Sequence, residues 1–443
     1  MRINGKFTAK SATFAIMSIA ERLKQSQNYL LCVLVFCIPF SFSLISLSII
    51  LLAVAWLFTG DLKGTWHNLK SRKVLWPFII FYLLHAISYC YSTDKANSLF
   101  DLQEKLSLII LPILVGAGMG IKDDWAERVF FWFTTSVTVL SIFCISRAVY
   151  IYFTHHISSQ FFYHDLVSGL DANAVYMAWY AIFSLLLLLF FPWTGIFKGR
   201  GKYLQIVYTV LQLCFFILLS AKTLTVLFFA IVVCYGASRF LSFKKFGLRQ
   251  VSLIAVCLGI IATVAFTDNP VKKRYTDVFR KDIANMDSTN AIQKSSANLT
   301  LRLFLWRVGM ENVREHNLWW YGAGNGDVSL LQNQKFAQHG IENIYNPNNR
   351  SNLYNVNLHN MYLQALMMLG LPGVACLLLI IATPFLYYRN EKYKPFSLMF
   401  GIIGVIFLFQ EAALQSLAGI VFYVLFIQIF TSVYYTNTHL NKH

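Results

Sequence analysis

Three side chains in this chain can move a proton or bind phosphate. His359 separates a long polar segment from an apolar run, and a neutral imidazole accepts a proton from a hydroxyl near pH 7. Lys222 lies between two apolar runs with almost no loop, and Arg302 lies in an aromatic-rich amphipathic segment. A guanidinium group binds two phosphate oxygens at once, whereas an ammonium group acts as a point charge. The residue types therefore indicate a proton acceptor and two cations for phosphate.

Each of these residues also has a purely structural interpretation. His359 can cap or line the start of a helix, and Lys222 can extend its ammonium group to water at a turn. Arg302 and Trp306 are four residues apart and share one helix face, while Arg307 points elsewhere. Such a face can anchor a helix among lipid headgroups without any catalytic part. The residues alone leave both interpretations open.

Two further features lie near the same parts of the chain. Asn360 follows His359 directly, and Glu411 follows the dipeptide Phe409-Gln410 at the end of an apolar run. An acid at that position can orient a cation, close a polar cavity or form a structural ion pair. The glycine cluster at 322–327 lacks both a Walker lysine and the strand context of a nucleotide site, so we interpret it as a tight backbone turn.

Metal or cofactor binding is not expected. The polar loops contain no Asp-x-Asp pair, no His-x-x-x-His motif and no glutamate-rich cluster. The eight cysteines all lie in apolar runs, and no pair has the spacing of zinc ligands. We therefore expect the cysteines to be buried small hydrophobic residues.

The composition indicates a membrane protein. Of 443 residues, 57% are hydrophobic and only 13% are charged, whereas soluble domains carry about 25% charged residues. This excludes a soluble globular enzyme, a disordered chain and a disulfide scaffold. The net charge of +17 does not indicate nucleic-acid binding, because the basic residues gather in short segments between apolar runs. We expect an all-α polytopic membrane protein with about 12 transmembrane helices.

The apolar runs divide the chain into three parts. They lie near residues 28–40, 42–59, 74–91, 105–121, 129–153, 174–191, 203–220, 223–240, 250–266, 373–388, 395–410 and 413–435. Pro39 splits the first two, which predicts a helical hairpin. We expect a transmembrane bundle of about nine spans over 1–266, a large polar loop over 267–357 and further transmembrane helices over 358–443. Within the loop, residues 300–316 are predicted to form an amphipathic helix opened by Thr300.

The distribution of basic residues predicts the orientation. Lysine and arginine gather at the N-terminus and in 60–73, 192–202 and 239–250, whereas the short alternate loops contain little besides Lys95. By the positive-inside rule, both termini are cytoplasmic and the 267–357 loop is external. A smaller external loop near 154–173 contains His155, His156, His164 and Asp165.

The order of these motifs resembles the O-antigen ligase and polymerase superfamily of bacterial inner-membrane glycosyltransferases. The resemblance rests on the large external loop before His359, on the acid Glu411 and on four short motifs. These motifs are Leu301-Arg302-x-x-x-Trp306, Gly322-x-Gly324-x-Gly326, His359-Asn360-x-x-Leu363 and Gly370-x-x-Gly373. The resemblance covers most of the chain and is strongest over about 215–430.

The resemblance implies a GT-C-like, metal-independent, inverting enzyme without a cofactor, whose active site lies on the periplasmic side of the inner membrane. The donor would be an undecaprenyl-diphosphate-linked glycan, and the acceptor a sugar of lipid A–core. Lys222 and Arg302 would bind the donor diphosphate, and His359 would be the catalytic base, with Asn360, Trp306 and Glu411 in support. Family members usually carry arginine where this sequence has Lys222. Membrane lipid is an expected partner, and nucleic acid is not.

Two alternatives remain. A polymerase of the same superfamily would use the same residues with another lipid-linked repeat unit as acceptor. A lipid-linked glycan transporter, which is a different class of protein, would need a charged central cavity, and the sparse charges within the apolar runs argue against one.

The orientation can be tested by thiol labelling on a background without the eight native cysteines. A cysteine introduced at Ser296 should react with an impermeant reagent added from the periplasmic side, whereas one at Ser242 should not. Labelling with the opposite pattern would place the large loop in the cytoplasm and would remove the basis for a periplasmic site.

Overall fold

The computed structural model describes residues 19–59, 61–170, 172–193, 197, 199, 201–241, 259, 299–339, 356–387 and 391–440. The described residues contain helices and no β-strand. The helices of the first half are α1 (Ile19–Cys37), α2 (Phe42–Thr59), α3 (Leu62–Ser71), η1 (Lys73–Leu75), α4 (Trp76–Tyr91), α5 (Lys95–Lys105), α6 (Ser107–Leu111), η2 (Pro112–Gly118), α7 (Asp123–His155), η3 (Ser158–Phe161), α8 (Tyr163–Val167), η4 (Ser168–Leu170), α9 (Ala174–Phe190), α10 (Gly201–Leu219) and α11 (Lys222–Leu241). Those of the second half are α15 (Leu299–Glu315), α16 (Val328–Gln338), α17 (Met361–Leu386), α18 (Lys394–Gln410), η5 (Ala413–Gln415) and α19 (Leu417–Leu440).

The all-helical character is confirmed, whereas the number of spans stays a prediction. Among the described residues, 4 helices are long and apolar enough to cross a membrane, or up to 6 if each of two bent helix pairs forms one span. Three shorter apolar helices lie at Lys222–Gly236, Lys394–Gln410 and Leu417–Val433. The expected span near 250–266, apart from residue 259, and residues 267–298 and 340–355 of the polar loop lie outside the described residues.

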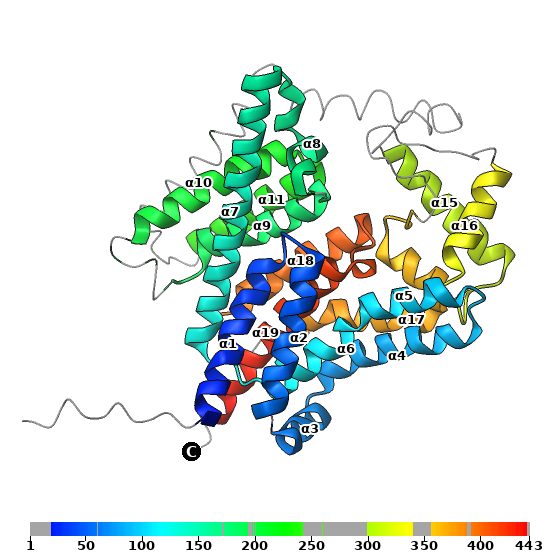
Figure 1. Cartoon of the computed structure of the whole chain (residues 1–443), viewed down its shortest axis with the longest axis horizontal. Helices are drawn as coiled ribbons and strands as arrows, with labels where there is room; N and C mark the ends of the chain where they lie inside the picture. The colour runs from blue at the N-terminus through cyan, green and yellow to red at the C-terminus, as the bar shows by residue number, and fades with distance from the viewer. Residues whose placement is uncertain are drawn as a thin grey trace, which may run out of the picture.

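The hairpin expected at Pro39 is present. Helix α1 ends at Cys37 and α2 begins at Phe42, the two helices pack side by side, and α1 also packs against α7 (Figure 1). A proline has no amide hydrogen to donate within a helix, and its ring clashes with the preceding helical turn. The helix therefore ends near Pro39, and the chain reverses there.

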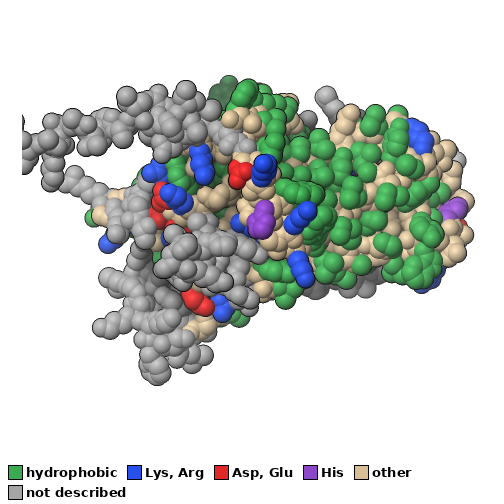
Figure 2. Space-filling model, turned by 90° about the horizontal axis from the view of Figure 1, so that it is seen from below, with side chains coloured by type: hydrophobic (Ala, Val, Ile, Leu, Met, Phe, Trp, Pro, Cys, Tyr) green, Lys and Arg blue, Asp and Glu red, His purple; other side chains and the backbone are tan. Residues whose placement is uncertain are grey.

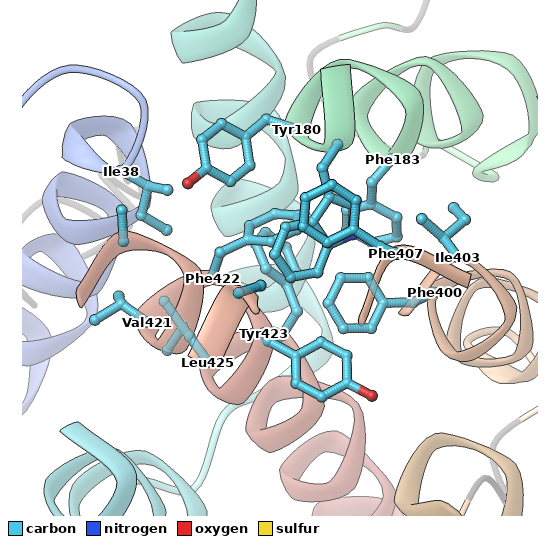
Figure 3. Packing of buried hydrophobic residues seen from close by; sticks show 14 of the residues in the cluster. Ile38, Tyr180, Phe183, Phe400, Ile403, Phe407, Val421, Phe422, Tyr423 and Leu425 are labelled. Carbon is cyan, nitrogen blue, oxygen red and sulfur yellow. The ribbon is translucent and has the colours of Figure 1, made fainter. Parts of the chain in front are cut away.

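The centre of the molecule is an aromatic cluster between α9, α18 and α19. Phe183, Phe400 and Phe422 point toward one another from these three helices (Figure 3). Trp179 stacks on Phe407 with ring centroids 4.1 Å apart. Aromatic pairs add directional contacts to apolar burial, so this cluster aligns α18, whose last turn leads to Glu411.

One apolar run is broken rather than continuous. The run near 105–121 was expected to form a single span, but α5 ends at Lys105, α6 is short and η2 is a π-helical stretch beginning at Pro112. Side chains from elsewhere bind the carbonyl groups of η2: Ser432 Oγ donates to Val115 O (3.0 Å) and Asn68 Nδ2 to Ala117 O (2.9 Å). The hydrogen-bond pattern of an α-helix changes here because a proline stands in the run and tertiary donors replace the usual ones.

The expectation that the cysteines are buried holds for only some of them. Cys32, Cys37, Cys144 and Cys376 are buried, Cys90, Cys214 and Cys234 are exposed, and Cys257 lies outside the described residues. An apolar helix in a membrane protein presents hydrophobic side chains outward as well as inward, so an apolar context does not by itself place a residue in the core. Figure 2 shows the broad hydrophobic surface that results.

The glycine cluster forms the expected tight turn, and it fits against a break in α17. Gly322 and Gly324 have φ of 66° and 86°, and Gly370 has φ of 68° inside α17. The released backbone groups pair across the contact, because Ala323 N donates to Met367 O (2.8 Å) and Leu371 N donates to Trp319 O (2.7 Å). A Cβ atom on Gly322 or Gly370 would lie within 2.6 Å of the facing backbone, so glycine is required at both positions.

The end of the same turn is bound to α4. The Asp327 carboxylate accepts from the backbone amides of Thr93 (2.8 Å) and Asp94 (2.9 Å), and the buried Asn325 Oδ1 lies 2.7 Å from His85 Nδ1. These contacts attach the segment between α15 and α16 to the apolar helices. They fix the position of α15, which carries Arg302.

Helix α15 confirms the amphipathic helix expected over 300–316, with a different start. It spans Leu299–Glu315, so Thr300 lies inside the helix and does not open it. Helix ends are set by local hydrogen bonding that the apolar pattern reports only to within one or two residues.

Candidate functional site

Three of the candidate residues meet at one buried carboxylate. Arg302 Nη2 donates to Glu411 Oε1 (2.6 Å), and His359 Nδ1 lies 2.8 Å from Glu411 Oε2. The Glu411 side chain is only 3% exposed, whereas Arg302 and His359 are 25% and 26% exposed. The Glu411 carboxylate is therefore enclosed, and its partners Arg302 and His359 are each partly exposed at the molecular surface.

Glu411 is positioned by the end of α18. Its amide donates to Phe407 O (2.8 Å) as the C-terminal cap, and its backbone is already extended. The chain then forms η5, which is bound from the side by Lys105, the last residue of α5. Lys105 is fully buried, forms an ion pair with Asp101 and donates to Gln415 Oε1 (3.0 Å). The segment that carries the carboxylate is thus held at both of its ends.

His359 is positioned by three polar side chains around the start of α17. Its amide donates to Asn357 Oδ1 (3.0 Å), and Asn360 Oδ1 accepts from Leu363 N (3.0 Å) as the helix cap. Gln364 Oε1 accepts from Leu358 N (3.0 Å). His359 itself has φ of 46°, a conformation that is uncommon for a residue other than glycine. Asn360 therefore supports the site as a helix cap, and the strained backbone is held in place by its neighbours.

Arg302 and Trp306 face the end of α18 together, as their spacing predicted. The Trp306 ring packs edge-to-face on Phe409, with centroids 5.1 Å apart, beside the Arg302–Glu411 ion pair. Arg307 points elsewhere and pairs with Glu311 (2.9 Å). Helix α15 is thus joined to α18 by one ion pair and one aromatic contact.

Lys222 lies at the first residue of α11, next to the same end of α18. The neighbouring Thr223 Oγ1 accepts from Gln410 Nε2 (2.6 Å), and Gln410 directly precedes Glu411. This side-chain hydrogen bond links the residue after Lys222 to the residue before Glu411. Arg302, His359 and Glu411 are therefore joined by direct contacts, and Lys222 is joined to them through its chain neighbour.

The charges of the surroundings keep Glu411 ionised. Burial raises the pKa of this carboxyl group, but the combined effect of His359, Arg302 and the more distant His164 is larger and holds the pKa below its usual value. His164 belongs to α8 in the smaller loop, and its effect on the pKa of Glu411 is the smallest of the three. A carboxylate bound to one ring nitrogen of a histidine leaves the other nitrogen as a proton acceptor.

Two residues of this arrangement were missed in the sequence. Lys105 begins an apolar run and lies four residues after Asp101, and that spacing was the available signal of a paired lysine. Gln415 carried no signal, because nothing in its neighbourhood indicates a partner from α5. Among the residues that the structure describes, no group of three or more His, Cys, Asp or Glu side chains could hold a metal ion.

Residues 207–378 match the family model described as O-antigen ligase (Wzy_C). The matched segment contains Lys222, Arg302, the glycine turn and His359, whereas Glu411 lies beyond it. No curated protein matches the chain significantly. The match confirms the resemblance to the O-antigen ligase and polymerase superfamily, and together with the apolar helices it indicates a membrane protein.

The structure contains a second Arg–Glu–His arrangement, which provides a matched control. Glu311 accepts from Arg307 (2.9 Å) and lies 2.9 Å from His339 Nε2, but its side chain is 26% exposed. We expect Glu411→Gln to lower the free energy of unfolding at pH 7 by about 2 kcal/mol, because a buried amide cannot serve both partners. Glu311→Gln should lower it by less than about 1 kcal/mol, because solvent already screens that group.

The stabilising effect of the Glu411 carboxylate should depend on pH in a defined direction. The pKa of Glu411 is lowered by folding, so its carboxylate stabilises the folded state above the pKa of an unfolded glutamate. The difference between wild type and Glu411→Gln should therefore be largest at neutral pH and shrink as the pH falls below about 4. The measurement is thermal unfolding in detergent at several pH values, and a difference that grows in acid would contradict the ion-pair description.

Proposed function

We propose that this protein is an O-antigen ligase-type glycosyltransferase that transfers a glycan from undecaprenyl diphosphate to a sugar hydroxyl of lipid A–core. The single observation that carries the proposal is the contact of one buried carboxylate with both Arg302 and His359. It brings a phosphate-binding group and a proton acceptor to one place. The family match over 207–378 supports the class of reaction.

His359 is proposed as the general base. When Nδ1–H donates to the Glu411 carboxylate, the unprotonated Nε2 is the atom that accepts the proton of the acceptor hydroxyl. Glu411 also stabilises the imidazolium that this transfer forms, as carboxylates do in other histidine-dependent enzymes. The strained backbone of His359 and the partial exposure of its ring support this role, because a purely structural ion pair with Glu411 would need neither feature.

Arg302 and Lys222 are proposed to bind the donor diphosphate. Glu411 uses one nitrogen of the Arg302 guanidinium group, and that group carries further N–H donors for phosphate oxygens. As the acceptor oxygen bonds to the anomeric carbon, the bond from that carbon to the phosphate oxygen breaks. The electron pair leaves with undecaprenyl diphosphate, whose negative charge the two cations stabilise. One displacement inverts the anomeric centre, and no metal is required.

The direct test uses purified protein, a synthetic prenyl-diphosphate glycan and two acceptors. Transfer of labelled glycan to lipid A–core supports the ligase, and transfer to a second lipid-linked repeat unit identifies the polymerase. Absence of transfer to either acceptor, from protein that is folded and binds the donor, contradicts both and favours a transporter.

The roles of His359 and Arg302 can be separated by kinetics. We expect His359→Ala to lower turnover by about 10²–10⁴-fold with little change in donor affinity, because a positioned base contributes that much. Arg302→Lys should instead weaken donor binding while retaining part of the turnover, because it keeps charge but loses two-point binding. The wild-type rate should fall in acid, because a protonated imidazole cannot accept a proton. Unchanged turnover per folded molecule in His359→Ala would remove this residue from the mechanism.

Lys105 is expected to act as a positioning residue. Lys105→Met should lower turnover per folded molecule by about 10²-fold, the effect of a roughly 1 Å displacement of a reacting group, because Gln415 and the Glu411 segment lose their anchor. Lys335 is the matched control, since it is also mostly buried and also binds a carboxylate and a glutamine, Glu315 and Gln338, away from the site. Lys335→Met should leave turnover per folded molecule unchanged, and Lys105→Arg should restore part of the loss. Equal effects of the two methionine variants would reduce Lys105 to a structural residue.

A further inference from the structure

Helix α3 lies across the end of an apolar helix instead of continuing it. The chain bends by 112° between α2 and α3, so that when α2 crosses a membrane, α3 lies close to the membrane plane. Its orientation is fixed from the other side. Asn68 Nδ2 donates to Ala117 O (2.9 Å), and the buried Arg72 donates to Gly116 O. The bend is therefore held by contacts with η2.

The side chains of α3 form three separate faces. Thr65 and Leu69 are buried and four residues apart, so they form the face toward η2. Leu62 and Trp66 form an exposed apolar face, and both are more than half exposed. A basic face lies next to it, with exposed Lys63 and Lys70 on α3 and exposed Lys73 just beyond its end.

The apolar face continues the outer surface of α2. Leu57 and Phe58, at the end of α2, are strongly exposed, and the next exposed hydrophobic residues along the chain are Leu62 and Trp66. Because the outer face of an apolar helix contacts lipid, the same lipid layer reaches α3 after the bend. Lys70 Nζ lies 4.7 Å from the centroid of the Trp66 ring, so a cation is placed directly above the apolar face.

We propose that α3 is a binding surface for anionic phospholipids at the membrane surface. Leu62 and Trp66 insert at the boundary between acyl chains and headgroups, and Lys63, Lys70 and Lys73 bind the lipid phosphates. The only acid on α3 or directly before it, Asp61, is occupied as the helix cap, since Oδ1 accepts from Gly64 N (2.9 Å). An amphipathic helix with a basic face binds anionic membranes by this combination of apolar insertion and charge attraction. Figure 2 views the molecule from below Figure 1, the side on which α3 lies, and shows Lys and Arg side chains beside the hydrophobic surface.

The proposal can be tested with the full chain in detergent, titrated with phosphatidylglycerol or phosphatidylcholine while bound lipid is counted by native mass spectrometry. Wild type should bind phosphatidylglycerol more tightly, and the preference should weaken in high salt. The double variant Lys63→Gln/Lys70→Gln should lose about 25-fold in phosphatidylglycerol affinity, or about fivefold for each lysine. Trp66→Ala should weaken the binding of both lipids.

The matched control is Arg307→Gln/Arg314→Gln, which removes the same charge from the exposed surface of α15. It should keep the preference of wild type. Three results overturn the proposal: no preference in wild type, a preference that survives in Lys63→Gln/Lys70→Gln, or an equal loss in the control. A protein that co-purifies in stoichiometric amount and is released by the α3 variant, without any lipid preference, would also overturn it.

Discussion

The organisation of the site depends on the burial of one carboxylate, that of Glu411. An isolated charge in such a place would take up a proton or be expelled, so it is stable only because Arg302 and His359 both bind it. This dependence is mutual. Arg302 comes from α15, His359 from the start of α17 and Glu411 from the end of α18, so the carboxylate joins three separate parts of the chain. Helix α15 is therefore held against the end of α18 partly by the same charges that we propose take part in catalysis.

Charge attraction alone does not fix the relative position of α15 and α17. The backbone hydrogen bonds of the glycine turn provide the additional constraint. The turn at Gly322 and Gly324 pairs with the break in α17 at Gly370, and Asp327 binds the backbone of Thr93 just beyond the end of α4. These hydrogen bonds tolerate little displacement because they are short and directional. They place α15 and the first turn of α17 relative to each other before any side chain of the site is considered. In this structure the glycine motif therefore has a positioning role.

The features of this arrangement that depend on local sequence patterns could be predicted, whereas those that depend on contacts between distant residues could not. Apolar runs gave the positions of the described long helices, and residue chemistry singled out His359, Arg302 and Glu411. The bonds of Glu411 to His359 and Arg302 join residues 52 and 109 positions apart, and no local pattern reports such a separation. The break between α5 and η2 was missed for the same reason, because donors from α3 and α19 stabilise it. Gln415, the second partner of Lys105, was likewise visible only in three dimensions.

The lysine at position 222, where the resembling family usually has arginine, fits the geometry of the rest of the site. In the proposed reaction Arg302 has to bind both Glu411 and the donor, and a planar guanidinium group with several donors can do both. Lys222 stands at the start of α11, next to the Thr223–Gln410 hydrogen bond, where a point charge on a flexible stem can follow the diphosphate as its charge develops. The two cations then have different tasks. In the proposed reaction, Arg302 would set the geometry of the donor relative to His359, and Lys222 would supply charge without imposing an orientation.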